Sequence, residues 1–178
     1  VPGTDDQIDV EFAVEEQPSG AISGTLAYSQ GYGLILGANY QQSNLQGSGN
    51  SLSVGLSYSE YQQSVNFNYF DPYFTLDGIS RGYNVFFRRL DYDARNIARY
   101  STDSAGGGVT FGFPIGETQR INFGLNVEHT EIREGFAAAQ EISEFIERNG
   151  PDALNFKANL SWIRSTLNRG VFADRGSS

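Results

Sequence analysis

The stretch LSVGLSYSEYQQSVNFNYF, residues 52–70, decides the fold class of this chain. Apolar residues alternate with serine or glycine in its first half and with serine or asparagine in its second half. The apolar positions are Leu52, Val54, Leu56, Val65, Phe67 and Tyr69. A period of two predicts two β-strands joined by a short turn, each with one apolar face. That face would meet a second sheet in a soluble sandwich, or lipid in a membrane barrel.

Composition supports an all-β fold and excludes several functions. The 178 residues include 21 Gly, 10 Tyr and 13 Phe, with no Cys or Met. Glycine and aromatic residues suit twisted strands better than helix bundles. The absence of Cys excludes a disulfide framework and a thiolate metal site. A net charge of -9 without a Lys/Arg cluster argues against nucleic acid as a partner.

The same alternation recurs along the chain and predicts about eight strands of the length that a tilted membrane strand needs. Besides the opening pair, strands are expected at 21–28, 33–42, 81–90, 107–115, 121–129 and 154–162. The residues expected to face lipid are Leu34, Leu36, Leu52, Val54, Leu56, Val65, Phe67, Tyr69, Phe111, Phe123, Leu125, Phe156, Leu160 and Trp162.

The opposite face of each strand favours the membrane barrel over a soluble sheet. It carries mostly Asn, Gly, Gln, Ser and Thr, with few Lys and Glu. Such residues suit a watery lumen, whereas a soluble barrel would place a charged face outside. Glu128 and Lys157 are both expected to point into the lumen, and the sequence leaves open whether they form an ion pair there. The expected fold is a transmembrane, antiparallel, up-and-down β-barrel fragment.

The connections alternate in type. Turn-rich links at 44–50, 71–80, 114–118 and 168–177 alternate with links at 29–33, 59–63, 91–106 and 130–153. Short turns on one side and longer loops on the other are typical of outer-membrane barrels. The last loop holds FAAAQEISEFIERNG, residues 136–150, which predicts a short amphipathic helix.

No residue pattern points to bond-making chemistry. His129, placed at the end of its expected strand, has no second His and no Cys to complete a metal site. The glycines of residues 105–112 lack the Lys and Ser/Thr of a phosphate loop. We therefore expect no enzyme, no cofactor and no metal.

Residues 1–18 differ in character from the rest of the chain. Residues 8–15 alternate apolar side chains with carboxylates, and EQPSG, residues 16–20, interrupts the pattern as a linker would. The start at Val1, without a leader, indicates either a removed signal peptide or a piece of a longer chain.

Five segments resemble the BamA family of bacterial outer-membrane assembly factors. They are residues 1–15, the NLQGSG turn at 44–49, DPYFTLDG at 71–78, TFGFPI at 110–115 and LNRGVFADRGSS at 167–178. The resemblance implies that residues 1–18 end the last periplasmic POTRA domain. Residues 19–178 would then form the first half of a sixteen-stranded barrel in the outer membrane of a Gram-negative bacterium.

The resemblance also implies a site and its partners. The first strand would be the lateral gate that templates an incoming strand: Ser19, Gly20, Ala21, Ile22, Ser23, Gly24, Thr25, Leu26, Ala27 and Tyr28. The implied partners are nascent outer-membrane proteins, periplasmic assembly lipoproteins and outer-membrane lipid. A related POTRA transporter, a complete eight-stranded outer-membrane barrel and a soluble β-sandwich binding module remain open alternatives.

Overall fold

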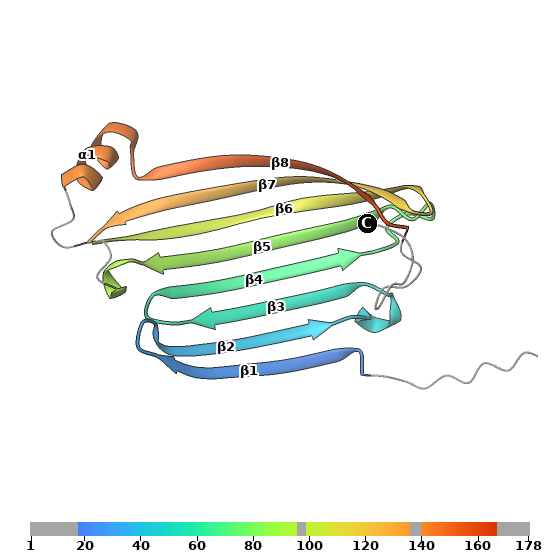
Figure 1. Cartoon of the computed structure of the whole chain (residues 1–178), viewed down its shortest axis with the longest axis horizontal. Coiled ribbons are helices and arrows are strands. Elements are labelled where there is room, and N and C mark those ends of the chain that lie inside the picture. The colour runs from blue at the N-terminus through green and yellow to red at the C-terminus, as the bar shows by residue number, and fades with distance from the viewer. Residues whose placement is uncertain (1–17, 96–98, 136–139, 167–178) are drawn as a thin grey trace, which may run out of the picture.

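A computed structural model describes residues 18–95, 99–135 and 140–166. The expected POTRA strand and most of the linker, as well as the motif at 167–178, lie outside the described residues. Eight antiparallel strands lie side by side in chain order in one sheet (Figure 1). They are β1 Gly20–Ser29, β2 Gly33–Gln42, β3 Ser51–Tyr58, β4 Gln62–Asp71, β5 Ser80–Asp91, β6 Tyr100–Gly116, β7 Gln119–Glu134 and β8 Asp152–Arg164.

The described residues contain one α-helix, α1 Gln140–Asn149, and two short 3₁₀ turns, η1 Leu45–Gly47 and η2 Asp93–Arg95. No helix in this part of the chain is long and apolar enough to cross a membrane. The expected all-β, up-and-down architecture with a short helix between the seventh and eighth strands is therefore confirmed.

The sheet is a single layer without a hydrophobic core. No hydrophobic side chain of the described residues is buried, because no second layer covers either face. Only one sheet forms in residues 18–166 apart from the gaps, which is incompatible with a two-sheet sandwich. The ladders run from β1 to β8 without a pairing between those two strands, so the described strands do not close an eight-stranded barrel.

The strand register places most apolar residues of the eight strands on one face, although Ile35, Phe86 and Ile163 lie on the other. Leu56 pairs with Val65, which pairs with Phe87, and the same relation joins Phe111, Phe123 and Leu160 farther along the sheet. All fourteen residues that the sequence assigned to lipid share this apolar face. Most Asn, Ser and Thr positions share the opposite, polar face, because side chains alternate along a strand and align across it, whereas Gly24 and Gly107 lie on the apolar face.

Two strands are longer than the sequence pattern predicted. Half of the expected loop at 91–106 is strand, because β6 begins at Tyr100, and β7 continues past His129 to Glu134. The placement of His129 at a strand end was therefore wrong. The added pairs are polar, such as Ser101 with Arg133, and carry no apolar alternation. Backbone pairing and ion pairs extend these strands beyond the apolar band.

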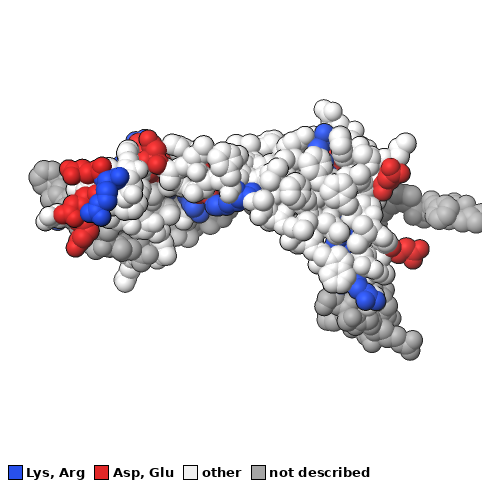
Figure 2. Space-filling model, turned by 90° about the horizontal axis from the view of Figure 1, so that it is seen from above, with Lys and Arg blue, Asp and Glu red and all other residues white. Residues whose placement is uncertain are grey.

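The connections meet at two ends of the sheet (Figure 1). The helix end carries α1 and the connections that follow β1, β3, β5 and β7. The turn end carries the connections that follow β2, β4 and β6. Figure 2 shows acidic and basic side chains gathered at the helix end of the face in view.

Candidate functional site

Strand β1 is an edge strand with one paired side. It pairs only with β2, from Gly20 opposite Gln42 to Ser29 opposite Gly33. Its other side meets no described strand, so alternate backbone N–H and C=O groups point outward without a partner strand. The apolar side chains of β1 are among the barest of the sheet, with Ile22 82% exposed, as are those of the other edge strand, β8. The structure thus brings Gly20 to Tyr28 into one continuous edge, with Ser19 just before it.

A set of hydrogen bonds fastens the start of β1 to the end of β2. Gln42 donates from Nε2 to Ser19 Oγ at 2.7 Å, and Tyr40 Oη donates to Gln42 Oε1 at 3.2 Å. Ser43 donates to the carbonyl of Ser19 through both its backbone N (2.7 Å) and its hydroxyl (2.9 Å). This group, Ser19, Tyr40, Gln42 and Ser43, is called the β1 anchor.

Glycine at position 20 leaves room for the Gln42 side chain of the β1 anchor. A Cβ atom there would lie 2.3 Å from Gln42 Oε1, so a larger residue would displace the glutamine side chain. The sequence did not single out Gln42, because a polar residue at the end of an alternating strand carries no signal of its own.

The far end of β1 is held by a tight turn. Tyr32 donates its backbone N–H to the carbonyl of Ser29 at 3.2 Å, and Gly33 has a φ of 66°, which favours glycine. β1 is therefore tied to β2 at both ends while its outer edge stays open.

The polar face beside β1 is hollowed. A depression of about 300 Å³ is lined on this face by Ser23, Thr25, Asn39, Ser57 and Asn66. Within it, Asn66 lies over Gly55, where a Cβ atom would be 2.7 Å from the amide group.

Asparagine over glycine recurs across the wall. Asn126 lies over Gly108 and Asn159 over Gly124, with amide oxygens 2.0 and 2.4 Å from where a Cβ atom would stand. Glu128 and Lys157 form an ion pair on the same face, which settles the charge pair left open by the sequence. The polar face is thus a thin layer of amides with few charges.

A four-residue ion cluster lies on the apolar face near the helix end. Asp103 accepts two hydrogen bonds from Arg89, at 2.6 Å from Nε and 2.5 Å from Nη2. Arg133 reaches Asp103 at 3.3 Å and Glu131 at 3.0 Å. The described residues contain no group of His, Cys, Asp and Glu that could hold a metal ion.

The DPYFTLDG motif at 71–78 has a structural explanation at the turn end. The guanidinium of Arg81 lies 3.7 Å from the centroid of the Phe74 ring and 3.8 Å from Asp71. Asp71 Oδ1 also accepts the backbone N–H of Tyr73 at 3.1 Å. Gly78, with a φ of 81°, completes the turn. These contacts fix the turn between β4 and β5.

An antiparallel wall with an apolar outer face, a polar inner face and an open first strand defines a fragment of an outer-membrane-type barrel. Residues 44–178 match the model of the Omp85 superfamily domain. The chain belongs to the Omp85 superfamily.

Similar proteins narrow this assignment. "Outer membrane protein assembly factor BamA" of Neisseria meningitidis serogroup B is 30% identical over 184 residues, covering 98% of this chain and 23% of the relative. BamA of Buchnera aphidicola is 30% identical over 126 residues, covering 71% of this chain and 20% of that protein. The crystal structure of BamA from Haemophilus ducreyi lacking POTRA domains 1–3 has a TM-score of 0.67 and 30% identity, with 97% of this chain and 35% of that chain covered. The resemblance to the BamA family is confirmed, and the chain spans about a fifth of the length of its curated relatives.

Proposed function

We propose that this chain is part of a bacterial outer-membrane assembly factor and that β1 is the template for an incoming strand. The BamA relatives support the first statement, and the free edge of β1 supports the second. Residues 19–178 form the first half of the barrel, and residues 1–18 end a periplasmic POTRA domain. The partners are nascent outer-membrane proteins, periplasmic assembly lipoproteins and outer-membrane lipid.

The proposed membrane placement follows from the two faces of the sheet. The apolar face meets lipid and the polar face lines a watery lumen, which is the arrangement that bare Leu, Val and Phe side chains favour. In hydrocarbon, an unpaired backbone edge is costly because no water satisfies its N–H and C=O groups. β1 therefore gains by pairing with any strand that reaches it.

The observation that carries the proposal is the combination of an open edge with fixed ends. The β1 anchor and the Ser29–Gly33 turn keep β1 extended, so its outer backbone groups stay in register for a second strand. Backbone hydrogen bonds give affinity that depends little on the side chains of the incoming strand. No covalent step is involved, so the chain acts as a scaffold and not as an enzyme.

Site-specific crosslinking in the full-length protein tests this function. Thr25→Cys in β1 is paired with a cysteine in the last strand of a substrate barrel, and the pair is oxidised during assembly. The matched control is Asn84→Cys, which lies on the same polar face but in β5, between two paired strands. A disulfide is expected with position 25 and none with position 84. A protein that assembles substrate without any crosslink at position 25 would overturn the templating role.

A further inference from the structure

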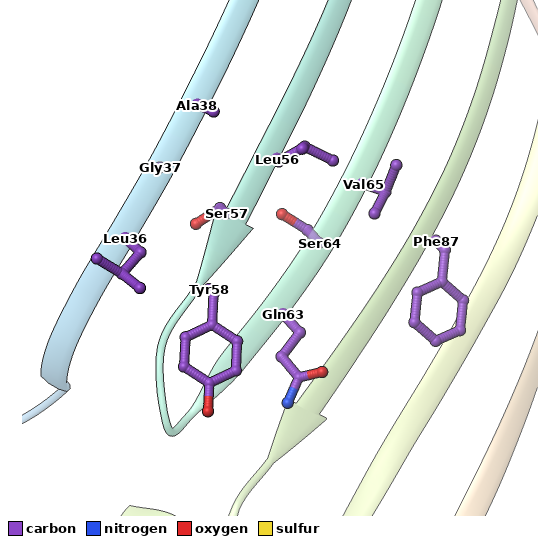
Figure 3. Close-up of a pocket in the computed structure, with 10 residues that line it drawn as sticks. All are labelled: Leu36, Gly37, Ala38, Leu56, Ser57, Tyr58, Gln63, Ser64, Val65 and Phe87. Atoms are coloured by element: carbon purple, nitrogen blue, oxygen red, sulfur yellow. The ribbon is translucent and has the colours of Figure 1, made fainter. Parts of the chain in front are cut away.

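The apolar face carries a groove that the templating function does not use. Its volume is about 380 Å³, and it crosses β2 to β5 near the helix end. Leu36, Leu56, Val65 and Phe87 form its walls (Figure 3). The lining residues of opposite parity, Gly37, Ser57 and Ser64, can contribute only backbone to this face, and Ala38 adds a single methyl group. The groove is therefore an apolar trough in the outer surface of the wall.

The trough extends toward β1 because small residues face each other there. Ala38 pairs with Gly24, and a second depression, lined by Ile22, Tyr40 and Val54, shares Ala38 with the trough. A Cβ atom at Gly24 would meet only the carbonyl of Gly37, at 3.9 Å. A low, apolar path thus runs from β1 to Phe87 on β5.

One end of the trough is polar. Tyr58 and Gln63 line it there, as Figure 3 shows, and they face each other as the last pair of the β3–β4 ladder. Gln63 is in turn opposite Arg89 on β5. A hydroxyl, an amide and a guanidinium therefore follow one another on one cross-strand row, within reach of a common ligand.

Tyr58, Gln63 and Arg89 each have a side-chain hydrogen-bond donor that no described residue uses. Among the described residues, neither the Tyr58 hydroxyl nor the Gln63 amide makes a hydrogen bond, and Arg89 uses Nε and Nη2 for Asp103 but leaves Nη1 unengaged. Asp103 lies on the side of Arg89 away from Gln63, since β6 is the neighbour of β5 opposite to β4. The carboxylate thus holds the guanidinium in place without covering its β4 side.

We propose that the trough binds a phosphate-bearing membrane lipid, with one acyl chain along Leu36, Leu56, Val65 and Phe87 and the phosphate at Gln63 and Arg89. An acyl chain is the occupant that an apolar trough on a lipid-facing wall selects, because the trough gives the chain more van der Waals contact with the Leu, Val and Phe side chains than a flat wall does. A phosphate oxygen accepts from a guanidinium more strongly than a neutral acceptor does. This lipid site depends on one part of the proposed function, which is that the apolar face lies in lipid.

Native mass spectrometry of the full-length protein in detergent tests the site. The probes are dipalmitoyl phosphatidylglycerol and dipalmitoylglycerol, which share acyl chains and differ in the phosphate. Wild type is expected to retain the phosphatidylglycerol preferentially. Ala38→Phe fills the trough and is expected to lower retention about tenfold, the factor that follows from losing roughly ten carbon–carbon contacts with the acyl chain. Val85→Phe, on the same face but outside the trough lining, is the matched control and is expected to bind as wild type does.

A second variant examines the polar end without filling the trough. Gln63→Leu is expected to reduce phosphatidylglycerol binding by roughly tenfold, as loss of a hydrogen bond to a charged group does, and to leave dipalmitoylglycerol binding unchanged. Equal retention by Ala38→Phe and Val85→Phe would overturn the trough, and equal retention of both lipids by wild type would overturn the phosphate site. Lipid retention with no crosslink at position 25 would reject templating alone.

Discussion

Strand β1 and the β6–β7 hairpin follow the same alternation but are stabilised differently. β1 has ten residues, one paired side and an anchor made of side-chain hydrogen bonds at its start. β6 and β7 have 17 and 16 residues, are paired on both sides, and carry ion pairs and tightly packed glycines. The hairpin is therefore a rigid frame, whereas β1 is a strand whose pairing partner on one side is left to be supplied.

Glycine illustrates the difference. In the hairpin, glycine is a packing requirement, since Asn126 and the backbone of Leu125 occupy the space above Gly108. In the middle of β1, Gly24 has open space around it. Glycine thus permits close packing in the β6–β7 hairpin, whereas in β1 it leaves a bare, low surface.

The largest expected effect is a loss of stability caused by a substitution in the β6–β7 hairpin. Gly108→Val places a side chain 2.5 Å from the carbonyl of Leu125, which cannot move without disturbing the β6–β7 ladder. We expect the free energy of unfolding to fall by about 2–3 kcal/mol, the usual cost of overpacking. Urea unfolding of the full-length protein in detergent measures it. Gly24→Ala is the matched control in β1, and a similar loss there would remove the distinction between the two regions.

A smaller effect is expected from the ion cluster that extends the hairpin. Asp103→Asn removes the charge that Arg89 and Arg133 share, while it keeps the size of the side chain. Because these arginines are partly exposed, the free energy of unfolding should fall by only about 1 kcal/mol. The loss should shrink at high salt, which screens exposed charges. Asp77→Asn, in the turn between β4 and β5, is the control, and an equal loss in it would contradict a specific role for the cluster.

The sequence predicted the frame of this molecule better than its site. Alternation identified all eight strands and placed every assigned apolar residue on one face, because a one-residue slip would reverse the faces of a strand. It missed the ends of β6 and β7, where pairs such as Asp103 with Glu131 are polar on both sides. It also missed Gln42 and the Gly–Asn contacts, since these depend on which residues the register brings together across strands.

The smallest expected effect is faster local opening at the start of β1. Gln42→Ala removes the side chain that bonds Ser19 and leaves the backbone bonds of Ser43 in place. Of the three hydrogen bonds that the Gln42 side chain makes, only the one to Ser19 holds the start of β1, and its loss should raise the opening equilibrium there by roughly 2–10-fold, with little change in global unfolding. Amide hydrogen exchange over residues 20–24 measures the opening, and Gln41→Ala, whose side chain makes no hydrogen bond among the described residues, is the control. Since β1 pairs on one side only, faster exchange confined to this strand would mean that its ends, and not its packing, keep it extended. Unchanged exchange in Gln42→Ala would instead assign that role to the β1–β2 ladder alone.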